Sequence, residues 1–129
     1  HLYPDSIFHY EIENEDQRLL MDRSQIEQVL INLLKNAQEA VEKEEAPFVC
    51  LTTHLSSNKR DFIISITDNG KGILPEVMER IFVPFFTTKT SGSGIGLSIC
   101  KQIVTLHGGT ITASSKPDDK TTFSVVLPV

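Results

Sequence analysis

Three carboxamide side chains at four-residue spacing are the first candidates for chemistry in this sequence. Gln28, Asn32 and Asn36 lie in a stretch with helical periodicity, so their side chains stack along one helix edge. Amide oxygens are neutral ligands for a hard cation such as Mg²⁺, which keeps water and takes its remaining ligands from nucleotide phosphates. Alone, however, this ridge is more typical of a solvated helix face. It indicates a binding site only together with other residues.

A carboxylate followed by two glycines forms the second candidate. Asp68 ends an apolar strand and shares a face with Ile66, and Gly70 and Gly72 come directly after it. An ionised carboxylate accepts hydrogen bonds only, so Asp68 suits the exocyclic amine of adenine, and the glycines let the backbone approach a ring. Alone, the D-N-G sequence more simply predicts a turn.

A glycine pattern, Gly92-Ser93-Gly94-Ile95-Gly96-Leu97, opens a predicted helix. Unpaired N–H groups and the positive end of the helix dipole make an anion site there, although a flexible hinge is the simpler alternative. The pattern is neither a P-loop nor a dinucleotide fingerprint, and Asp68-Asn69-Gly70 is not D-F-G. The sequence patterns of P-loop proteins, Rossmann-type dinucleotide-binding proteins and eukaryotic-type kinases are therefore absent.

An aromatic segment from Phe82 to Lys89 lies between the last two candidates. Taken singly, its phenylalanines predict core positions. In a loop between two ligand sites, they favour a lid that its aromatic side chains anchor, with Lys89 meeting phosphate charge.

The elements that position these residues begin with an alternating pattern. Phe8, Tyr10 and Ile12 alternate with polar residues, and a second apolar patch covers residues 19–21. The two patterns predict a hairpin.

A long helix over residues 24–42 carries the carboxamide ridge, with Asp22 or Ser24 as its N-cap. Its apolar stripe consists of Ile26, Val29, Leu30, Leu33, Ala37 and Val41.

The remaining patterns mix strands and helices without strict alternation. They predict strands 48–55 and 62–68, a short helix from Pro75, a largely buried helix 95–107 stopped by Gly108-Gly109, and strands 109–113 and 121–127. This order predicts an α+β fold, a two-layer α/β sandwich whose mixed, mostly antiparallel sheet carries helices on one face.

Composition narrows the class of protein. A chain of 129 residues with 40% hydrophobic content suits a single domain over residues 1–129. The net charge of −5 argues against nucleic-acid binding. Cys50 and Cys100 lie outside any paired spacing, which predicts reduced, buried thiols. Apolar runs are too short to cross a bilayer, so we expect a soluble domain without direct membrane contact, although a parent protein could be membrane-anchored. The location that we expect for this domain is cytoplasmic.

In order and spacing, the four candidate segments resemble the N, G1, F and G2 boxes of sensor histidine kinase catalytic domains. These domains belong to the GHKL superfamily, which also contains gyrase, Hsp90 and MutL. The likeness runs from about Asp22 to the end of the chain, and four ordered boxes are far more specific than one. The resemblance implies a Bergerat-type ATP-binding fold with ATP and Mg²⁺ as ligands.

The resemblance also implies a role for individual residues. It makes Asn36 the Mg²⁺ ligand and Asp68 the adenine reader, and Thr121 matches a threonine near adenine that usually follows glycine but here follows Lys120. The implied catalytic residues are Asn32, Asn36 and Lys89. The implied ATP-binding residues line the base pocket or surround the phosphates: Asn32, Asn36, Asp68, Gly70, Gly72, Ile73, Phe82, Lys89, Gly92, Gly94, Ile95, Gly96, Leu97 and Thr121.

Asn32 distinguishes branches of the superfamily. Gyrase-like ATPases and anti-sigma serine kinases carry a glutamate at this position as general base, and a carboxamide cannot take that proton. Self-contained ATP hydrolysis and serine phosphorylation are therefore disfavoured. A neutral histidine acceptor already has a free lone pair, so the resemblance implies in-line transfer of the γ-phosphoryl group of ATP to histidine.

We expect the accepting histidine on a separate domain. In the family it is typically followed by Asp or Glu, as none of the four histidines here is, and the abrupt start at His1 predicts a fragment. The implied partners are the dimerisation and phosphoacceptor domain of the same kinase and, indirectly, a response regulator. Two alternatives stay open, a nucleotide-gated interaction module without transfer and a small anti-sigma serine kinase.

Overall fold

The structure, a computed structural model, describes residues 8–14, 16–86, 96–115 and 119–129. Its elements in chain order are β1 (Phe8–Ile12), α1 (Arg23–Val41), β2 (Val49–Leu55), β3 (Asp61–Asp68), α2 (Pro75–Met78), α3 (Gly96–Leu106), β4 (Thr110–Ser115) and β5 (Thr121–Pro128).

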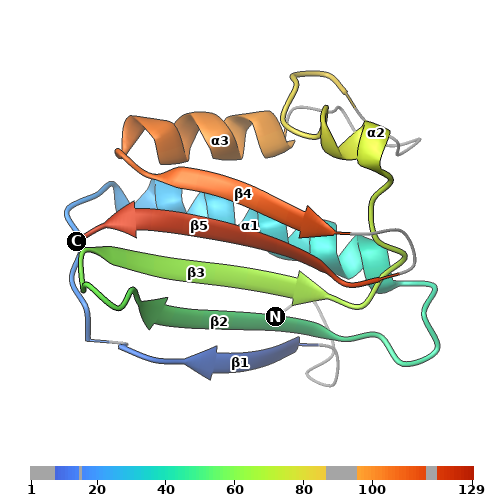
Figure 1. The fold of residues 1–129 in the computed structure, drawn as a ribbon, viewed down its shortest axis with the longest axis horizontal. Coiled ribbons are helices and arrows are strands. Elements are labelled where there is room, and N and C mark those ends of the chain that lie inside the picture. The colour runs from blue at the N-terminus through green and yellow to red at the C-terminus, as the bar shows by residue number, and fades with distance from the viewer. Residues whose placement is uncertain (1–7, 15, 87–95, 116–118) are drawn as a thin grey trace.

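The strands form one sheet in the order β1-β2-β3-β5-β4, in which β1 and β2 are parallel and all other pairs are antiparallel. Figure 1 shows α1 behind the sheet and α3 beside the β4 edge, and the two helices contact each other. The predicted α+β sandwich with a mixed, mostly antiparallel sheet and helices on one face is confirmed.

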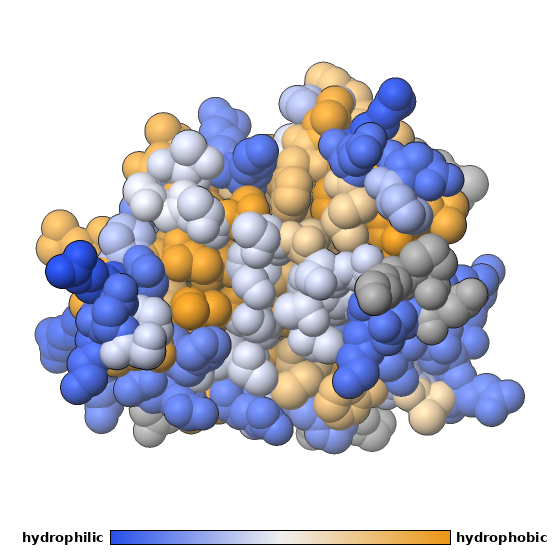
Figure 2. All heavy atoms as spheres, in the orientation of Figure 1, coloured by the Kyte–Doolittle hydropathy of each residue, from blue (hydrophilic) through white to orange (hydrophobic). Residues whose placement is uncertain are grey.

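The opposite sheet face is open and carries hydroxyl side chains, which give pale areas in Figure 2. Across β3 and β5, Ser65 Oγ lies 3.0 Å from Ser124 Oγ, and Thr67 Oγ1 lies 2.9 Å from Thr122 Oγ1. These cross-strand pairs satisfy one another, which suits a face that needs no covering layer.

The predicted hairpin at the start of the chain is wrong. Strand β1 pairs in parallel with β2, from Phe8 opposite Val49 to Ile12 opposite Thr53. Residues 19–21 form no strand, and Leu20 is fully exposed. Alternation of apolar and polar residues identifies a strand but not the strand that it pairs with. The partner of β1 is β2, which follows α1 in the chain.

Helix α1 begins as expected, with Asp22 as the N-cap. The Asp22 carboxylate accepts the N–H of Gln25 at 3.1 Å and the hydroxyl of Ser24 at 2.8 Å. The predicted stripe faces the core, with Ile26 and Leu30 partly buried at its margin and four fully packed members, Val29, Leu33, Ala37 and Val41.

Helix α3 ends at the predicted glycines. Gly108 adopts a φ of +76°, and the N–H of Gly109 donates to the carbonyl of Val104 at 2.9 Å. The expectation of a largely buried helix was wrong, because only the side facing α1 and β4 is covered and Leu106 is 72% exposed. Its three buried residues are Cys100, Ile103 and Val104.

The two cysteines are free and buried, as predicted. Burial raises the pKa of the Cys50 thiol, and the nearby Glu11 carboxylate adds to the shift. Among the described helices, none has the length and apolar character needed to cross a membrane.

Candidate nucleotide-binding site

Three neighbouring strands end in a row of polar side chains on the face that carries the helices. Asp68 at the end of β3 lies opposite Thr121 at the start of β5, and Thr121 lies opposite Ser115 at the end of β4. Asp68 is 3% exposed and Thr121 is 4% exposed. Ser115 is half-buried. Two buried polar residues side by side are unusual at a strand end, where solvent normally covers polar groups.

Asp68 is held in an environment that disfavours its charge. Its Oδ1 accepts the N–H of Gly70 at 2.9 Å. Burial raises the pKa of the Asp68 carboxyl, the hydrogen bond from Gly70 opposes that shift, and the charge of Glu44 adds to it. One protein donor leaves further acceptor positions on this carboxylate, so it suits a ligand that brings a hydrogen-bond donor.

The two glycines after Asp68 have steric reasons for their identity. A Cβ at Gly70 would lie 2.6 Å from the carbonyl oxygen of Ala40, near the end of α1. Gly72 adopts a φ of +79°, in the left-handed region. These glycines bring the loop after β3 against the last turn of α1, beside Asp68.

Asn69, which sequence reasoning treated only as part of a turn, fastens this loop to the segment before β2. Its Oδ1 accepts the N–H of Phe48 at 2.9 Å, and its Nδ2 donates to the carbonyl of Ala46 at 2.8 Å. The available signal was a carboxamide directly after a strand-ending aspartate, because such side chains commonly bond neighbouring backbone.

Ser115 was also missed. Its hydroxyl accepts the N–H of Ile73 at 2.8 Å and lies 2.8 Å from the hydroxyl of Thr121. The predicted strand stopped at Ala113, whereas β4 continues, and the alternation from Ile111 through Ala113 puts Ser115 on the core face. Through Ser115, the structure brings Ile73 together with Thr121.

The carboxamide ridge runs into the contact between α1 and α3. Gln28 is exposed, whereas Asn32 and Asn36 are half-buried. Burial raises the pKa of the Cys100 thiol on α3, and a hydrogen bond with the Asn32 side chain opposes that shift. Asn32 therefore faces the helix that the glycine pattern opens, and Asn36 lies one turn further along α1.

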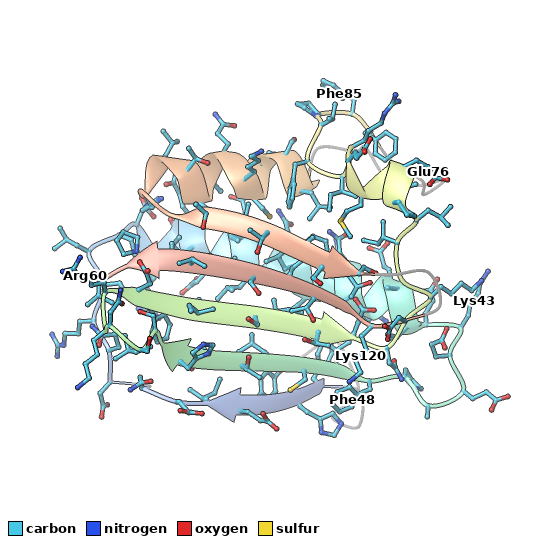
Figure 3. The ribbon with its side chains drawn as sticks, viewed as in Figure 1. Lys43, Phe48, Arg60, Glu76, Phe85 and Lys120 are labelled. Carbon is cyan, nitrogen blue, oxygen red and sulfur yellow. The ribbon has the colours of Figure 1, made fainter. Side chains whose placement is uncertain are left out.

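Phe82 is anchored to the core, as a lid residue was expected to be. Its ring meets Phe123 edge-on with centroids 6.3 Å apart, and the Lys101 ammonium lies 5.6 Å from its centroid. Phe85 is 77% exposed and points away from the sheet in Figure 3. Within the described part of the aromatic segment, which ends at residue 86, Phe82 packs against the core and Phe85 does not.

Several predicted site residues lie outside the described residues, namely Lys89, Gly92, Gly94 and Ile95. Of the rest of that pattern, Gly96 opens α3, and a Cβ there would meet nothing within 4 Å. Leu97 packs against the core.

The residues fit Mg²⁺ as part of a nucleotide complex. Asn36 offers the hard oxygen that Mg²⁺ prefers. Within the described residues, no three His, Cys, Asp or Glu side chains gather closely enough to hold a metal. Such a site would therefore use one or two amide oxygens, with phosphate oxygens as the other anionic ligands.

The domain is an α+β sandwich that buries a carboxylate at its strand ends, which suits a ligand with a hydrogen-bond donor such as a nucleotide base. The family described as histidine kinase-, DNA gyrase B-, and HSP90-like ATPase matches residues 21–129. The catalytic domain of histidine kinase ThkA, solved without nucleotide, is 40% identical with a TM-score of 0.82, and the match covers 95% of this chain and 78% of that one. The chain belongs to this family of ATP-binding domains.

Two further relatives extend the comparison. The signal transduction histidine-protein kinase AtoS of Escherichia coli (strain K12) is 38% identical over 92% of this chain, which spans only 19% of AtoS. A structure of histidine kinase ThkA in complex with response regulator protein TrrA matches 94% of this chain and 33% of that chain, at 37% identity and a TM-score of 0.76. The matched kinases are thus several times longer than this chain.

Proposed function

We propose that this chain binds Mg-ATP and donates the γ-phosphoryl group to a histidine on a separate dimerisation and phosphoacceptor domain, as the catalytic domain of a sensor histidine kinase. The observation that carries this proposal is the buried carboxylate of Asp68 beside Thr121, at strand ends that lie close to the last turn of α1. Membership of the ATPase family supports the choice of nucleotide.

The base is proposed to bind against Asp68 and Thr121. Adenine presents an amine donor beside a ring nitrogen acceptor, whereas guanine presents a carbonyl beside a ring N–H. An ionised Asp68 only accepts, while the hydroxyl of Thr121 is able to donate, so together they match adenine. Guanine would set its carbonyl oxygen against a buried carboxylate, which predicts a preference for ATP over GTP.

The phosphates are proposed to lie between α1 and the start of α3. Asn36 would hold Mg²⁺ there with Asn32 beside it, while Lys89 and the glycines at 92, 94 and 96 would meet phosphate oxygens. The contact between Asn32 and Cys100 supports this placement, because it sets the ridge against α3. Bound Mg²⁺ supplies charge that offsets the phosphate oxygens during transfer.

The transfer itself needs positioning and charge compensation rather than a strong base. A neutral imidazole nitrogen attacks the γ-phosphorus with its lone pair, and the bond to the bridging oxygen breaks so that ADP leaves with that electron pair. Asn32 cannot serve as a general base, which suits an acceptor that already has a lone pair. The domain acts only when the accepting histidine is presented to it.

The partners follow from this reaction. The histidine would come from the phosphoacceptor domain of the same kinase, and the phosphoryl group would pass on to a response regulator. The solved ThkA complex with a response regulator supports the second step for a relative of this domain. We propose a cytoplasmic location, where ATP and a response regulator are available.

A calorimetric titration with ATP and then GTP, with and without Mg²⁺, tests the binding step on the intact chain and on Asp68→Asn. We expect saturable, ATP-selective binding that the variant loses. A folded chain that binds no ATP would overturn the proposal.

A radiolabel transfer assay tests the chemistry, with and without the cognate phosphoacceptor domain. Label on the histidine of that domain, and none on this chain alone, is the expected result. Persistent ATP binding without transfer to the natural partner would instead favour a nucleotide-gated interaction module.

A further inference from the structure

One serine links two parts of the site that are 42 residues apart in sequence. Ser115 Oγ lies 2.8 Å from the backbone nitrogen of Ile73, which donates to it. The same oxygen lies 2.8 Å from Thr121 Oγ1. Ile73 lies in the segment between β3 and α2 and packs against the core, so the hydroxyl fixes this segment next to the end of the sheet.

The geometry admits two directions for the hydrogen bond between the hydroxyls of Ser115 and Thr121. A serine hydroxyl has one proton and two acceptor sites, and the N–H of Ile73 occupies one of those sites. If Ser115 donates to Thr121, the proton of Thr121 stays available on the side of Asp68, its neighbour in the sheet register. If Thr121 donates to Ser115 instead, Thr121 offers a ligand only an acceptor.

Only the first arrangement complements adenine. In the binding mode proposed above, the ring nitrogen beside the amine of adenine is an acceptor, so Thr121 would donate there while Asp68 accepts from the amine. When Ser115 donates to Thr121 and Thr121 donates to the base, each hydroxyl proton has an acceptor. A buried donor without an acceptor would cost free energy.

We propose that Ser115 is a positioning residue for the nucleotide. Its hydroxyl holds Ile73 over the base site and directs the proton of Thr121 toward the ligand, and thereby sharpens the choice of adenine over guanine. The inference rests on the ATP-binding function proposed above. Ser115 acts through Thr121 and Ile73 and has no part in the phosphoryl transfer.

The test compares Ser115→Ala with Ser115→Thr, which keeps the hydroxyl, and with Ser114→Ala as a matched control. Ser114 is the preceding residue of β4 and points to the open sheet face, where it is exposed. Calorimetry with ATP and GTP measures affinity, and the transfer assay with the phosphoacceptor domain separates KM from kcat. Amide NMR follows the N–H of Ile73.

We expect Ser115→Ala to weaken ATP binding about tenfold and to narrow the gap between ATP and GTP, because two hydrogen bonds are lost. KM for ATP should rise while kcat changes little, and the Ile73 amide should shift and exchange faster. Ser115→Thr should restore all of these properties, and Ser114→Ala should leave them unchanged.

Equal ATP affinity in Ser115→Ala and Ser114→Ala, with a wild-type chain that binds ATP, would overturn the inference and leave the proposed function standing. Failure of Ser115→Thr to restore affinity would also overturn it, because packing rather than the hydroxyl would then explain the loss. Absence of ATP binding by the wild-type chain would instead defeat the proposed function. Should Ser115→Ala fail to fold, Ser115→Cys keeps the shape with a much weaker hydrogen bond and must show the same loss.

Discussion

Two aspartates at opposite ends of the molecule accept backbone N–H groups, yet their environments act on them in opposite directions. Asp22 caps α1, and the N–H of Gln25 and the hydroxyl of Ser24 hold the pKa of its carboxyl below the ordinary value of 3.8. Asp68 accepts the N–H of Gly70, yet burial raises the pKa of its carboxyl. The first carboxylate stabilises the fold in its charged form, whereas burial disfavours the charged form of the second.

The surroundings of the two aspartates differ in the same sense. Near Asp22, the backbone N–H of the cap residue donates to His107 Nε2 at 3.1 Å, and His107 Nδ1 lies 2.8 Å from the carbonyl of Ile103. The start of α1 and the end of α3 are thus joined by satisfied hydrogen bonds. Near Asp68, the carboxylate accepts one hydrogen bond, from the N–H of Gly70, and keeps further acceptor positions, which is why we propose that this end binds the nucleotide.

The largest expected effect that separates the two residues is on ATP affinity. Asp68→Asn presents an amide in place of an acceptor-only carboxylate and should weaken ATP binding roughly 100-fold, because a hydrogen bond to a charged group is lost. Asp22→Asn, at the other end of the molecule, should bind ATP as the wild type does. Calorimetry measures the ATP affinity of both variants. A similar loss of affinity in the two would contradict a specific role of Asp68 in ATP binding.

The second expected effect is on stability at the cap. Asp22→Ala should lower the melting temperature of the nucleotide-free domain, because the N–H of Gln25 loses its acceptor. Asp22→Asn keeps an oxygen acceptor and should lose less. Thermal unfolding by circular dichroism measures both, and an unchanged Asp22→Ala variant would show that the cap contributes nothing.

The two aspartates should also give opposite pH dependence. A lowered folded-state pKa means that Asp22 contributes stability above its unfolded pKa, near 3.8, and loses that contribution as pH falls through the folded value. A raised folded-state pKa means that the Asp68 contribution is present below its unfolded pKa and is lost as pH rises through the folded value. Urea unfolding at a series of pH values between about 3 and 7 measures the free energy of unfolding and follows the contributions of both aspartates.

From these signs, Asp68→Asn should be more stable than the wild type at neutral pH without nucleotide, and the difference should shrink as pH falls toward 4. The difference between the wild type and Asp22→Ala should instead persist down to the unfolded pKa of 3.8 and shrink only below it, as the carboxylate is protonated and its favourable charge is lost. A neutral or destabilising Asp68→Asn at pH 7 would contradict the burial penalty.

The smallest expected effect concerns Glu44, whose charge adds to the raised pKa of Asp68. Glu44→Gln should relieve part of this repulsion and stabilise the nucleotide-free domain by no more than about 0.5 kcal/mol, the usual range for a surface change. The gain should fall at high salt. Glu45→Gln is a matched control one residue away, and an equal gain there would point to net charge rather than to Asp68.

Much of the fold was predictable because it depends on local pattern. The stripe of α1, its N-cap and the glycine stop of α3 each follow from residues a few positions apart. The candidate site residues were also predictable from short stretches of sequence, because Asp68 lies beside its glycines and Asn32 and Asn36 lie on one predicted helix. The sequence by itself therefore determined most of the elements and the kinds of group that they present, but neither the hairpin predicted at the start of the chain nor the end of β4.

Only the tertiary structure decided which groups meet. The parallel partner of β1, the hydrogen bond from Ile73 to Ser115 and the clamp that Asn69 makes on Phe48 join residues at least 21 positions apart. Strand order sets these contacts, and a one-dimensional period carries no information about strand order. The burial that raises the pKa of Asp68 arises in the same way, because it requires the end of α1 and the neighbouring strands to close around one carboxylate.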